Sequence, residues 1–199
     1  MRTDPLLHAL YQLPDFPDAL RPDTEYGVRF RKHVDSLVEF KRYDHPEILL
    51  SAGHRANEMY FLNQGLARAY KYDDRSGDEL TDFLWEAPAF VLDAESFYLQ
   101  QPSETFLQVW EGEVISASYA DLEETAQLFP EVLLLTRSVV VEQTKYYRQR
   151  LDNIRTMKAE ARYRTLLEKH PRIVQNFPVY ILASFLGIAP TSLSRLRRR

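Results

Sequence analysis

The sequence contains no cysteine among its 199 residues and only 6 glycines, and it has no long apolar run. Without cysteine, disulfides and iron–sulfur or zinc–thiolate sites are excluded. No segment approaches the roughly 18 consecutive apolar residues of a membrane-spanning helix, and the first residues lack the pattern of a secretion signal. We therefore expect a cytoplasmic protein with no membrane partner.

Histidine is also scarce. The five histidines, at positions 8, 33, 45, 54 and 170, show no paired ligand spacing, so the sequence predicts no metal site. A haem would have to use one of these scattered histidines, and nothing around them favours it. We expect no cofactor.

Charge is distributed unevenly, although the net charge is only −4. Residues 142–199 hold 13 Lys and Arg against 4 Asp and Glu, whereas residues 1–141 hold 12 against 25. A basic C-terminal part on an acidic body indicates that one end meets a polyanion. A solvated basic face is the simpler alternative.

Between about residues 38 and 120, the sequence consists of short segments rich in β-branched and aromatic residues. Turn-forming residues, among them Gly53, Gly65, Gly77 and Gly112, separate these segments. Many short strands at this spacing predict an antiparallel β-roll or sandwich. Two stretches, LARAYKYDDRSGDELTDFLW and TFLQVWEGEVISASY, are interpreted as long hairpins. Short helices are expected in the proline-broken first 35 residues.

A helical pattern begins near residue 119. YADLEETAQLF is expected to form a helix capped by Asp121, and a longer helix is expected over 130–154. The longer helix has two apolar stripes, although packing on a single β-roll requires only one. One stripe contains Leu133, Val140, Thr144, Tyr147, Leu151 and Ile154, and the other contains Val132, Leu135, Val139 and Tyr146. We assign the second stripe to a homodimer interface; burial of the helix inside a monomer is the alternative.

The C-terminal segment has the pattern of a helix-turn-helix. Ala183 supplies the small residue between the helices, Gly187 supplies the turn, and Pro190 suits the start of the second helix. The apolar positions that would form the small core are Leu182, Leu186, Ile188, Leu193 and Leu196. The second helix would expose Thr191, Ser192, Ser194, Arg195, Arg197, Arg198 and Arg199 as DNA-binding residues. An arginine such as Arg195 can bind both acceptors of a guanine, while the last arginines suit phosphates.

A β-roll, a long helix and a C-terminal helix-turn-helix, in this order, resemble the CRP/FNR family of bacterial transcription regulators. The resemblance covers about residues 30–199 and is sharpest in MYFLNQGLARAYKYDDRSGDELTDFLW and LASFLGIAPTSLSRLRR. It implies an α+β fold. An antiparallel β-roll of the double-stranded β-helix or jelly-roll type would occupy 1–129, the dimerisation helix 130–154, and a winged-helix-like DNA-binding domain 155–199.

The resemblance also implies a function. A homodimer would bind a roughly two-fold DNA site with one recognition helix per half-site, and RNA polymerase is a further partner that the resemblance suggests. Compared with the family members that respond to cyclic AMP, Pro190 and Thr191 stand where Arg-Glu is expected, so the half-site should differ. The β-hairpin wing is contracted to RIVQNFP, and Lys169 and Arg172 are candidates to replace its backbone contacts.

The chain departs from the family most clearly where cyclic AMP is bound. The family's cassette has Gly-Glu followed by Pro-Arg; here Pro102 matches, but Ser103 replaces the arginine, and Asp93-Ala94 fall at the Gly-Glu positions. Negative charge near the expected phosphate disfavours a cyclic nucleotide. The effector is unidentified, and the candidate pocket residues are Phe83, Trp85, Asp93, Glu95, Ser103 and Glu104. The alternative is that the aromatic residues of this region are part of the hydrophobic core and line no pocket.

Taken together, these patterns predict a DNA-binding transcriptional regulator rather than an enzyme. The first alternative is a cupin-like small-molecule-binding β-barrel with a helical tail and no DNA role. A cupin-like metal site needs two or three histidines on neighbouring strands, and only His45 and His54 fall in the strand region. The second alternative is a regulator that binds another protein through its acidic body.

Overall fold

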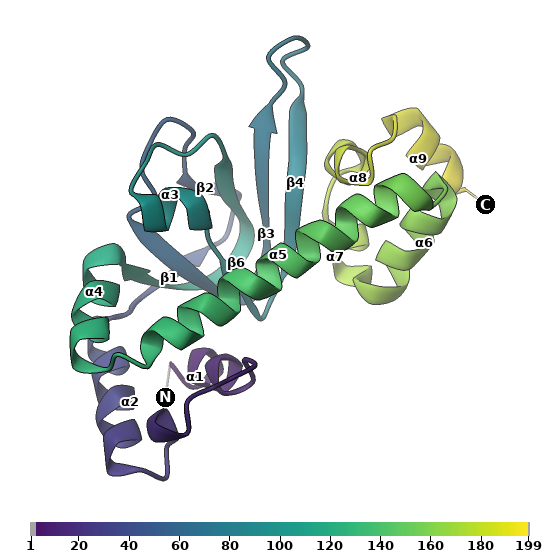
Figure 1. Cartoon of the computed structure of the whole chain (residues 1–199). Helices are drawn as coiled ribbons and strands as arrows, with labels where there is room; N and C mark the ends of the chain where they lie inside the picture. The colour runs from purple at the N-terminus through teal and green to yellow at the C-terminus, as the bar shows by residue number, and fades with distance from the viewer. Residues whose placement is uncertain (1–2, 199) are drawn as a thin grey trace.

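The computed structural model describes residues 3–198 and shows an α+β chain in which a β-sheet precedes most of the helices (Figure 1). The strands are β1 (Glu39–Tyr43), β2 (Glu47–Leu50), β3 (Glu58–Tyr72), β4 (Glu79–Glu86), β5 (Ala89–Val91) and β6 (Phe106–Ser118). The helices are α1 (Asp4–Tyr11), the 3-10 turn η1 (Asp18–Leu20), α2 (Glu25–Leu37), α3 (Ala94–Leu99), α4 (Tyr119–Leu128), α5 (Val132–Thr156), α6 (Ala159–Lys169), α7 (Pro171–Asn176), α8 (Val179–Leu186) and α9 (Pro190–Leu196).

The sheet is organised around the two long strands, β3 and β6, which pair antiparallel. β1 and β2 pair in succession with β6, while β4 and β5 both pair with β3. Because each long strand is shared by two short ones, the sheet curls into a roll around one apolar core. The sequence-based prediction of an antiparallel β-roll is confirmed, as is the β3–β4 hairpin.

The second predicted hairpin is wrong, because TFLQVWEGEVISASY forms the single strand β6. Gly65 and Gly112, which were interpreted as turns, lie opposite each other inside β3 and β6. Both have positive φ, 96° and 141°, and the register of the two strands shifts on either side of this pair. A Cβ on either glycine would lie within 2 Å of a backbone oxygen of the facing strand. Glycine therefore lets the two strands bend at close approach rather than reverse.

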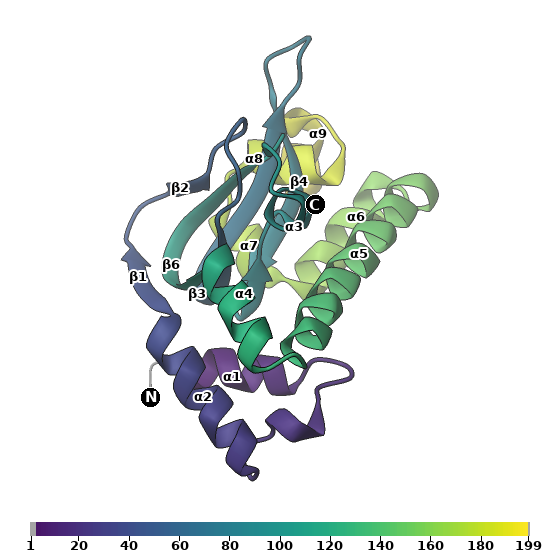
Figure 2. The same ribbon diagram turned by 60° about the vertical axis from the view of Figure 1, so that its left-hand side comes forward.

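The N-terminal helices and α4 gather at one end of the sheet, opposite the projecting tip of the β3–β4 hairpin (Figure 2). The cap of α4 is Ser118, not Asp121 as expected; Asp121 completes a capping box from the third helical position. Leu7, Leu20 and Phe30 of the N-terminal segment form a core with Phe129 and the start of α5.

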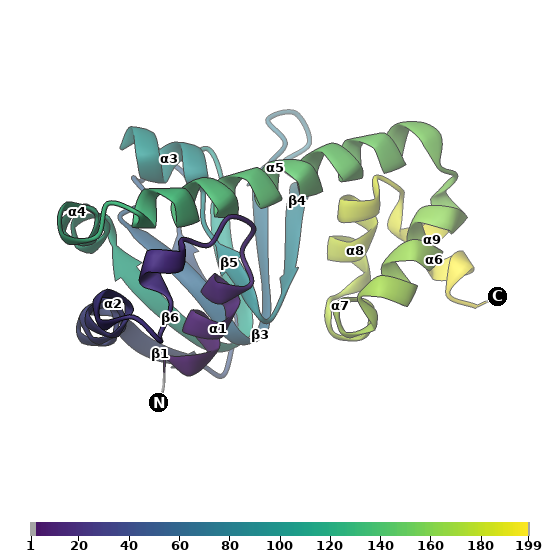
Figure 3. The ribbon, with the colours of Figure 1, turned by 60° about the horizontal axis from the view of Figure 1, so that its bottom comes forward.

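Helix α5 runs the length of the molecule, from the N-terminal helices and α4 at one end to α6, α8 and α9 at the other (Figure 3). The last four helices share a core built around Ile181, Leu182 and Leu193, all fully buried. This core also includes Leu66 of β3 and Leu84 of β4. The C-terminal helices are therefore packed directly on the outer face of the roll.

Candidate nucleic-acid interface and adjoining cavity

Helices α8 and α9 form the steep, short-turn pair that the sequence predicts. Their axes differ by 100°, within the range of helix-turn-helix motifs. Gly187 ends α8 in the left-handed conformation, with φ of 64° and ψ of 43°, and Pro190 occupies the first turn of α9. Ala183 is fully buried where the two helices meet.

Helix α9 buries one side and exposes the other. Leu193 is fully buried, while Thr191, Ser192, Arg195 and Arg198 are exposed. Neither the Arg195 nor the Arg198 guanidinium group has a hydrogen bond or ion pair with any residue from 3 to 198. Two hydroxyls and one unpaired guanidinium group thus lie on the exposed part of α9, and a second unpaired guanidinium group, that of Arg198, follows the end of the helix. This arrangement suits base edges and phosphates.

Two of the other predicted DNA-binding side chains have partners within the protein. Arg197 donates a 2.7 Å hydrogen bond to the carbonyl oxygen of Val174, at the end of α7. Ser194 donates to the carbonyl oxygen of Pro190 at 3.0 Å, as serines inside helices often do. Arg199 lies outside the described residues. The face available to a ligand is consequently centred on Thr191, Arg195 and Arg198.

Side-chain to backbone hydrogen bonds fix α8 on the roll. The Ser184 hydroxyl accepts from the N–H of Thr81 at 2.8 Å and donates to the carbonyl oxygen of Glu79 at 2.9 Å. Arg150 of α5 donates to the carbonyl oxygens of Thr81 at 3.1 Å and of Phe185 at 3.0 Å. One arginine therefore connects α5, β4 and α8, so the position of the helix-turn-helix depends on that of α5.

The apolar stripe assigned to a dimer interface lies inside the chain, which corrects that assignment. Val132 and Leu135 belong to the core of the N-terminal helices, and Val139 is equally buried. Tyr146 stacks on Phe83 of β4, with ring centroids 4.1 Å apart. Val132, Leu135 and Val139 are therefore not exposed to a second copy, and Tyr146 is partly covered by its packing on β4.

The other stripe of α5 is the exposed one. Leu133 and Leu151 are 56% and 50% exposed, and Tyr147 and Ile154 are also open to solvent. Positions 133, 140, 147 and 154 are separated by seven residues, the spacing of a coiled-coil seam. We name Leu133, Val140, Thr144, Tyr147, Leu151 and Ile154 the α5 seam.

The segment before the helix-turn-helix forms α7 rather than a β-hairpin. Pro171 both ends α6 and begins α7, where its missing N–H costs nothing. Arg172 lies 3.7 Å from a carboxylate oxygen of Glu86, and Lys169 is exposed. Of the two basic residues considered as replacements for a wing, Lys169 is thus the one without an ion pair in residues 3–198.

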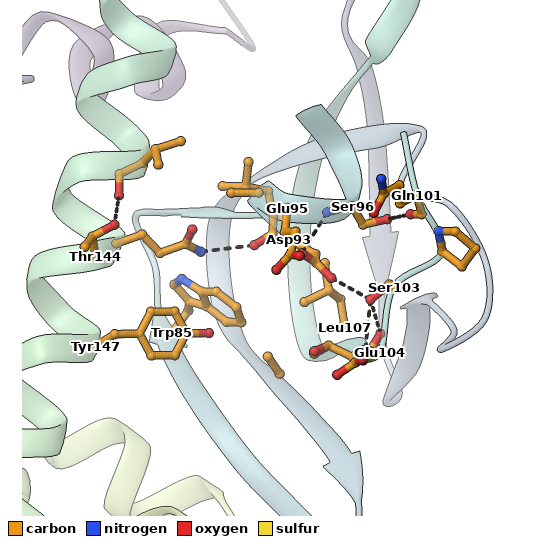
Figure 4. Close-up of a pocket in the computed structure, with 17 residues that line it drawn as sticks. Trp85, Asp93, Glu95, Ser96, Gln101, Ser103, Glu104, Leu107, Thr144 and Tyr147 are labelled. Carbon is orange, nitrogen blue, oxygen red and sulfur yellow. Dashed lines mark hydrogen bonds between the residues drawn. The ribbon is translucent and has the colours of Figure 1, made fainter. Parts of the chain in front are cut away.

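A cavity of about 570 Å³ lies between the roll and α5 (Figure 4). The roll contributes Trp85, the start of α3 and the segment 101–105, while α5 contributes Val140, Gln143, Thr144 and Tyr147. Five of the six candidate pocket residues line it: Trp85, Asp93, Glu95, Ser103 and Glu104. Gln143 and Tyr147 could not be predicted as cavity residues from the sequence, because they reach the cavity only through the packing of α5 on the roll.

Asp93 and Ser103 are joined in the wall of this cavity. The Ser103 hydroxyl donates to the Asp93 carboxylate at 2.5 Å and accepts from the N–H of Thr105 at 2.8 Å. The other Asp93 oxygen caps α3 by accepting from the N–H of Ser96 at 3.2 Å. The pair therefore fills, with a negative charge, the place where the sequence comparison expected an arginine.

Phe83 does not line the cavity, which corrects its selection as a pocket residue. It lies in the core between Trp85 and Tyr146, stacked on each at a centroid distance of 4.1 Å, and Tyr147 meets it edge-on at 5.1 Å. Phe83 therefore joins a wall of the cavity to α5. Phe97 of α3, another aromatic side chain of this region, also belongs to the core.

Neither metal sites nor single membrane-spanning helices are found among residues 3–198. No group of three or more histidine, aspartate or glutamate side chains could hold a metal ion there. No single helix in that range is long and apolar enough to cross a membrane; only the bent pair α8–α9 passes such a test, and by length and composition alone.

No protein-family model matches the sequence, and no curated protein matches it either. Solved structures do match its fold. The c-di-GMP-responsive global regulator CLP of Xanthomonas campestris aligns over 86% of this chain and 90% of its own, with a TM-score of 0.67 and 18% identity. FixK2 of Bradyrhizobium japonicum aligns over 81% and 83%, with a TM-score of 0.69 and 15% identity.

A transcriptional regulator of the CRP/FNR family from Eubacterium rectale matches as well, over 85% of this chain and 81% of its own, with a TM-score of 0.68 and 14% identity. The fold expected from the sequence is thereby confirmed: the chain has the fold of CRP/FNR regulators over most of its length. At these identities the likeness concerns the fold alone.

Proposed function

We propose that this protein is a DNA-binding transcriptional regulator of the CRP/FNR type. The observation that carries the proposal is the exposed surface of α9, the second helix of a helix-turn-helix, with Thr191 and Arg195 on the helix and Arg198 just after its end. This helix would enter the major groove, with Arg195 reaching base edges and Arg198 reaching phosphates. The fold shared with CLP, FixK2 and the Eubacterium regulator supports the same role.

The acting form would be a homodimer formed along the α5 seam. A two-fold axis beside α5 would place two copies of α9 side by side, as a roughly palindromic site with one helix per half-site requires. The half-sites would lie about 34 Å apart on one face of the duplex. Such a dimer would work in the cytoplasm and could contact RNA polymerase.

Regulation would pass through α5. The helix forms one wall of the 570 Å³ cavity and holds α8 through Arg150. A ligand that moves α5 would therefore change the spacing of the two α9 helices, with a coupling of about 1–3 kcal/mol typical of such switches. A cyclic nucleotide is disfavoured, because no Lys, Arg or His lines the cavity to balance a phosphate.

The binding of the protein to a DNA duplex at several salt concentrations tests this proposal. Fluorescence anisotropy with a labelled duplex should give tight binding at low salt and a linear fall of log affinity with log salt. Arg198→Ala should reduce the magnitude of that slope by about 1, the contribution of one phosphate contact.

Arg29→Ala is the matched control, because Arg29 is exposed on α2, far from α9 (Figure 3). It removes the same charge and should leave the slope unchanged. Failure of the wild-type protein to bind any duplex at low salt would contradict the proposal, as would equal slopes for the Arg198 variant and wild type.

A further inference from the structure

The cavity between the roll and α5 has the size of a small-molecule site and a negatively charged lining. Its volume of about 570 Å³ falls within the range of roughly 300–1,000 Å³ of small-molecule sites. Its lining includes three carboxylate side chains, Asp93, Glu95 and Glu104, and no basic side chain. The lining therefore favours a bound molecule that carries positive charge over one that carries negative charge.

The three carboxylates differ in the hydrogen bonds that they already make within the protein. Asp93 already accepts hydrogen bonds from Ser96 and Ser103. Glu95 and Glu104 are exposed, and their carboxylate groups make no hydrogen bond or ion pair with any residue from 3 to 198. Two unpaired carboxylates thus stand at the rim, and in Figure 4 they lie on the α3 side, across from Thr144 and Tyr147.

Carboxylates alone would indicate only a solvated edge, but a buried tryptophan side chain in the cavity wall also has a donor without a protein partner. Trp85 is 5% exposed and lines the cavity, and its indole N–H donates no hydrogen bond to any described residue. The ring is buried while the N–H keeps access to the cavity, and the indole N–H of a buried tryptophan usually has an acceptor. A molecule in the cavity that offers an acceptor would satisfy this group.

Aromatic groups complete the lining. The Trp85 ring is held in place by stacking on Phe83, and Tyr147 faces the cavity from α5. Burial, followed by the charges of Asp82 and Asp93, raises the pKa of Tyr147 to about 12, so its hydroxyl stays neutral at physiological pH. Neutral aromatic rings beside carboxylates are the combination that attracts organic cations.

We propose that this cavity binds a small organic cation that also carries a hydrogen-bond acceptor, such as an amine or quaternary ammonium compound with a hydroxyl group. Glu95 and Glu104 supply the charge, the Trp85 and Tyr147 rings contact the cationic group, and the Trp85 N–H binds the acceptor. The inference deepens the proposed function and rests on its account of regulation, because it gives the chemical class of the ligand that would act in this cavity.

Trp85 itself reports on binding. The sequence has two tryptophans, and the other, Trp110, packs beside Phe177 on the opposite side of the sheet. In a Trp110→Phe background, all tryptophan fluorescence comes from Trp85. The full chain would be titrated with choline, ethanolamine and glucosamine, and with 3,3-dimethylbutan-1-ol, the neutral isostere of choline. Cyclic AMP serves as the anionic probe.

At least one of the three cations is expected to change the Trp85 fluorescence saturably, whereas the neutral isostere and cyclic AMP are not. Glu95→Gln/Glu104→Gln should weaken binding of that cation about tenfold or more, since each lost carboxylate removes a charged partner. Glu111→Gln/Glu124→Gln, which makes the same charge change at exposed positions outside the cavity lining, should bind as wild type does.

Three results would overturn the proposal: no saturable change with any of the three cations, equal affinity for choline and its neutral isostere, or unchanged affinity in the Glu95/Glu104 variant. Thermal unfolding of each variant checks that it folds. Because the titration needs no DNA, its failure is distinguishable from failure of the proposed function.

Discussion

Gly65 and Gly187 both have positive φ, but the surroundings of an added side chain differ. At Gly187 a Cβ would meet no atom within 4 Å, whereas at Gly65 it would lie 1.7 Å from the carbonyl oxygen of Glu111. Gly187→Ala should therefore cost only the left-handed backbone penalty, about 1 kcal/mol of unfolding free energy. Gly65→Ala should cost about 3 kcal/mol or more, because two strands must separate.

Urea unfolding of the two variants and the wild-type protein measures this difference. Equal losses of stability would contradict the account of Gly65 as the point of closest strand approach. The comparison is internal, since the same substitution is made at two glycines of positive φ.

At the residue scale, the sequence predicted Gly187 correctly and Gly65 and Gly112 incorrectly, and the reason is physical. A positive φ is needed both for a turn and for a bulge inside a strand. Gly187 lies between two helical patterns, so only a turn fits there. Gly112 lies between two strand patterns, where a reversal and a bend look the same in sequence. Only the pairing of Gly112 with Gly65 distinguishes them.

At the element scale, the sequence of α5 is also compatible with two structures. Both of its stripes are apolar, and the sequence could not determine which one the roll and the N-terminal helices cover. The seven-residue spacing of 133, 140, 147 and 154 was the available signal for the exposed stripe. Val132 and Leu135 are covered by the N-terminal segment, whose core residues Leu7 to Phe30 lie about a hundred residues or more earlier in the chain. A contact over this sequence distance could not be inferred from the local pattern.

Leu151→Glu tests the α5 seam. Leu151 is 50% exposed, so a glutamate there should leave the fold intact. In a two-fold dimer the change occurs on both sides, and the dissociation constant should rise by about 100-fold. Sedimentation equilibrium measures it. Leu128→Glu, at an equally exposed leucine of α4, is the control and should leave the dimer unchanged. A monomeric wild-type protein, or equal effects of the two variants, would contradict the seam.

At the scale of the whole molecule, one helix connects two chemically different ends. The acidic roll holds a cavity with carboxylates, and the basic C-terminal end holds α9, with Arg195 on the helix and Arg198 just after it. Between them, α5 stacks Tyr146 on Phe83 and holds α8 through Arg150. The order of these parts and the basic end were predictable from sequence. Their docking was not, because it depends on Ser184 and Arg150 meeting backbone groups of β4.

Selection of bound sequences from a random DNA library, with wild-type protein and with Arg195→Ala, tests the central claim most directly. The wild-type protein should enrich an inverted repeat whose half-sites are centred about 10 base pairs apart. Arg195→Ala should still bind DNA in a salt-dependent way but lose preference at one symmetric base pair, at a cost of about 1–3 kcal/mol. No enriched motif with the wild-type protein, or the same motif equally enriched by the variant, would contradict the assignment of α9 as the helix that reads DNA.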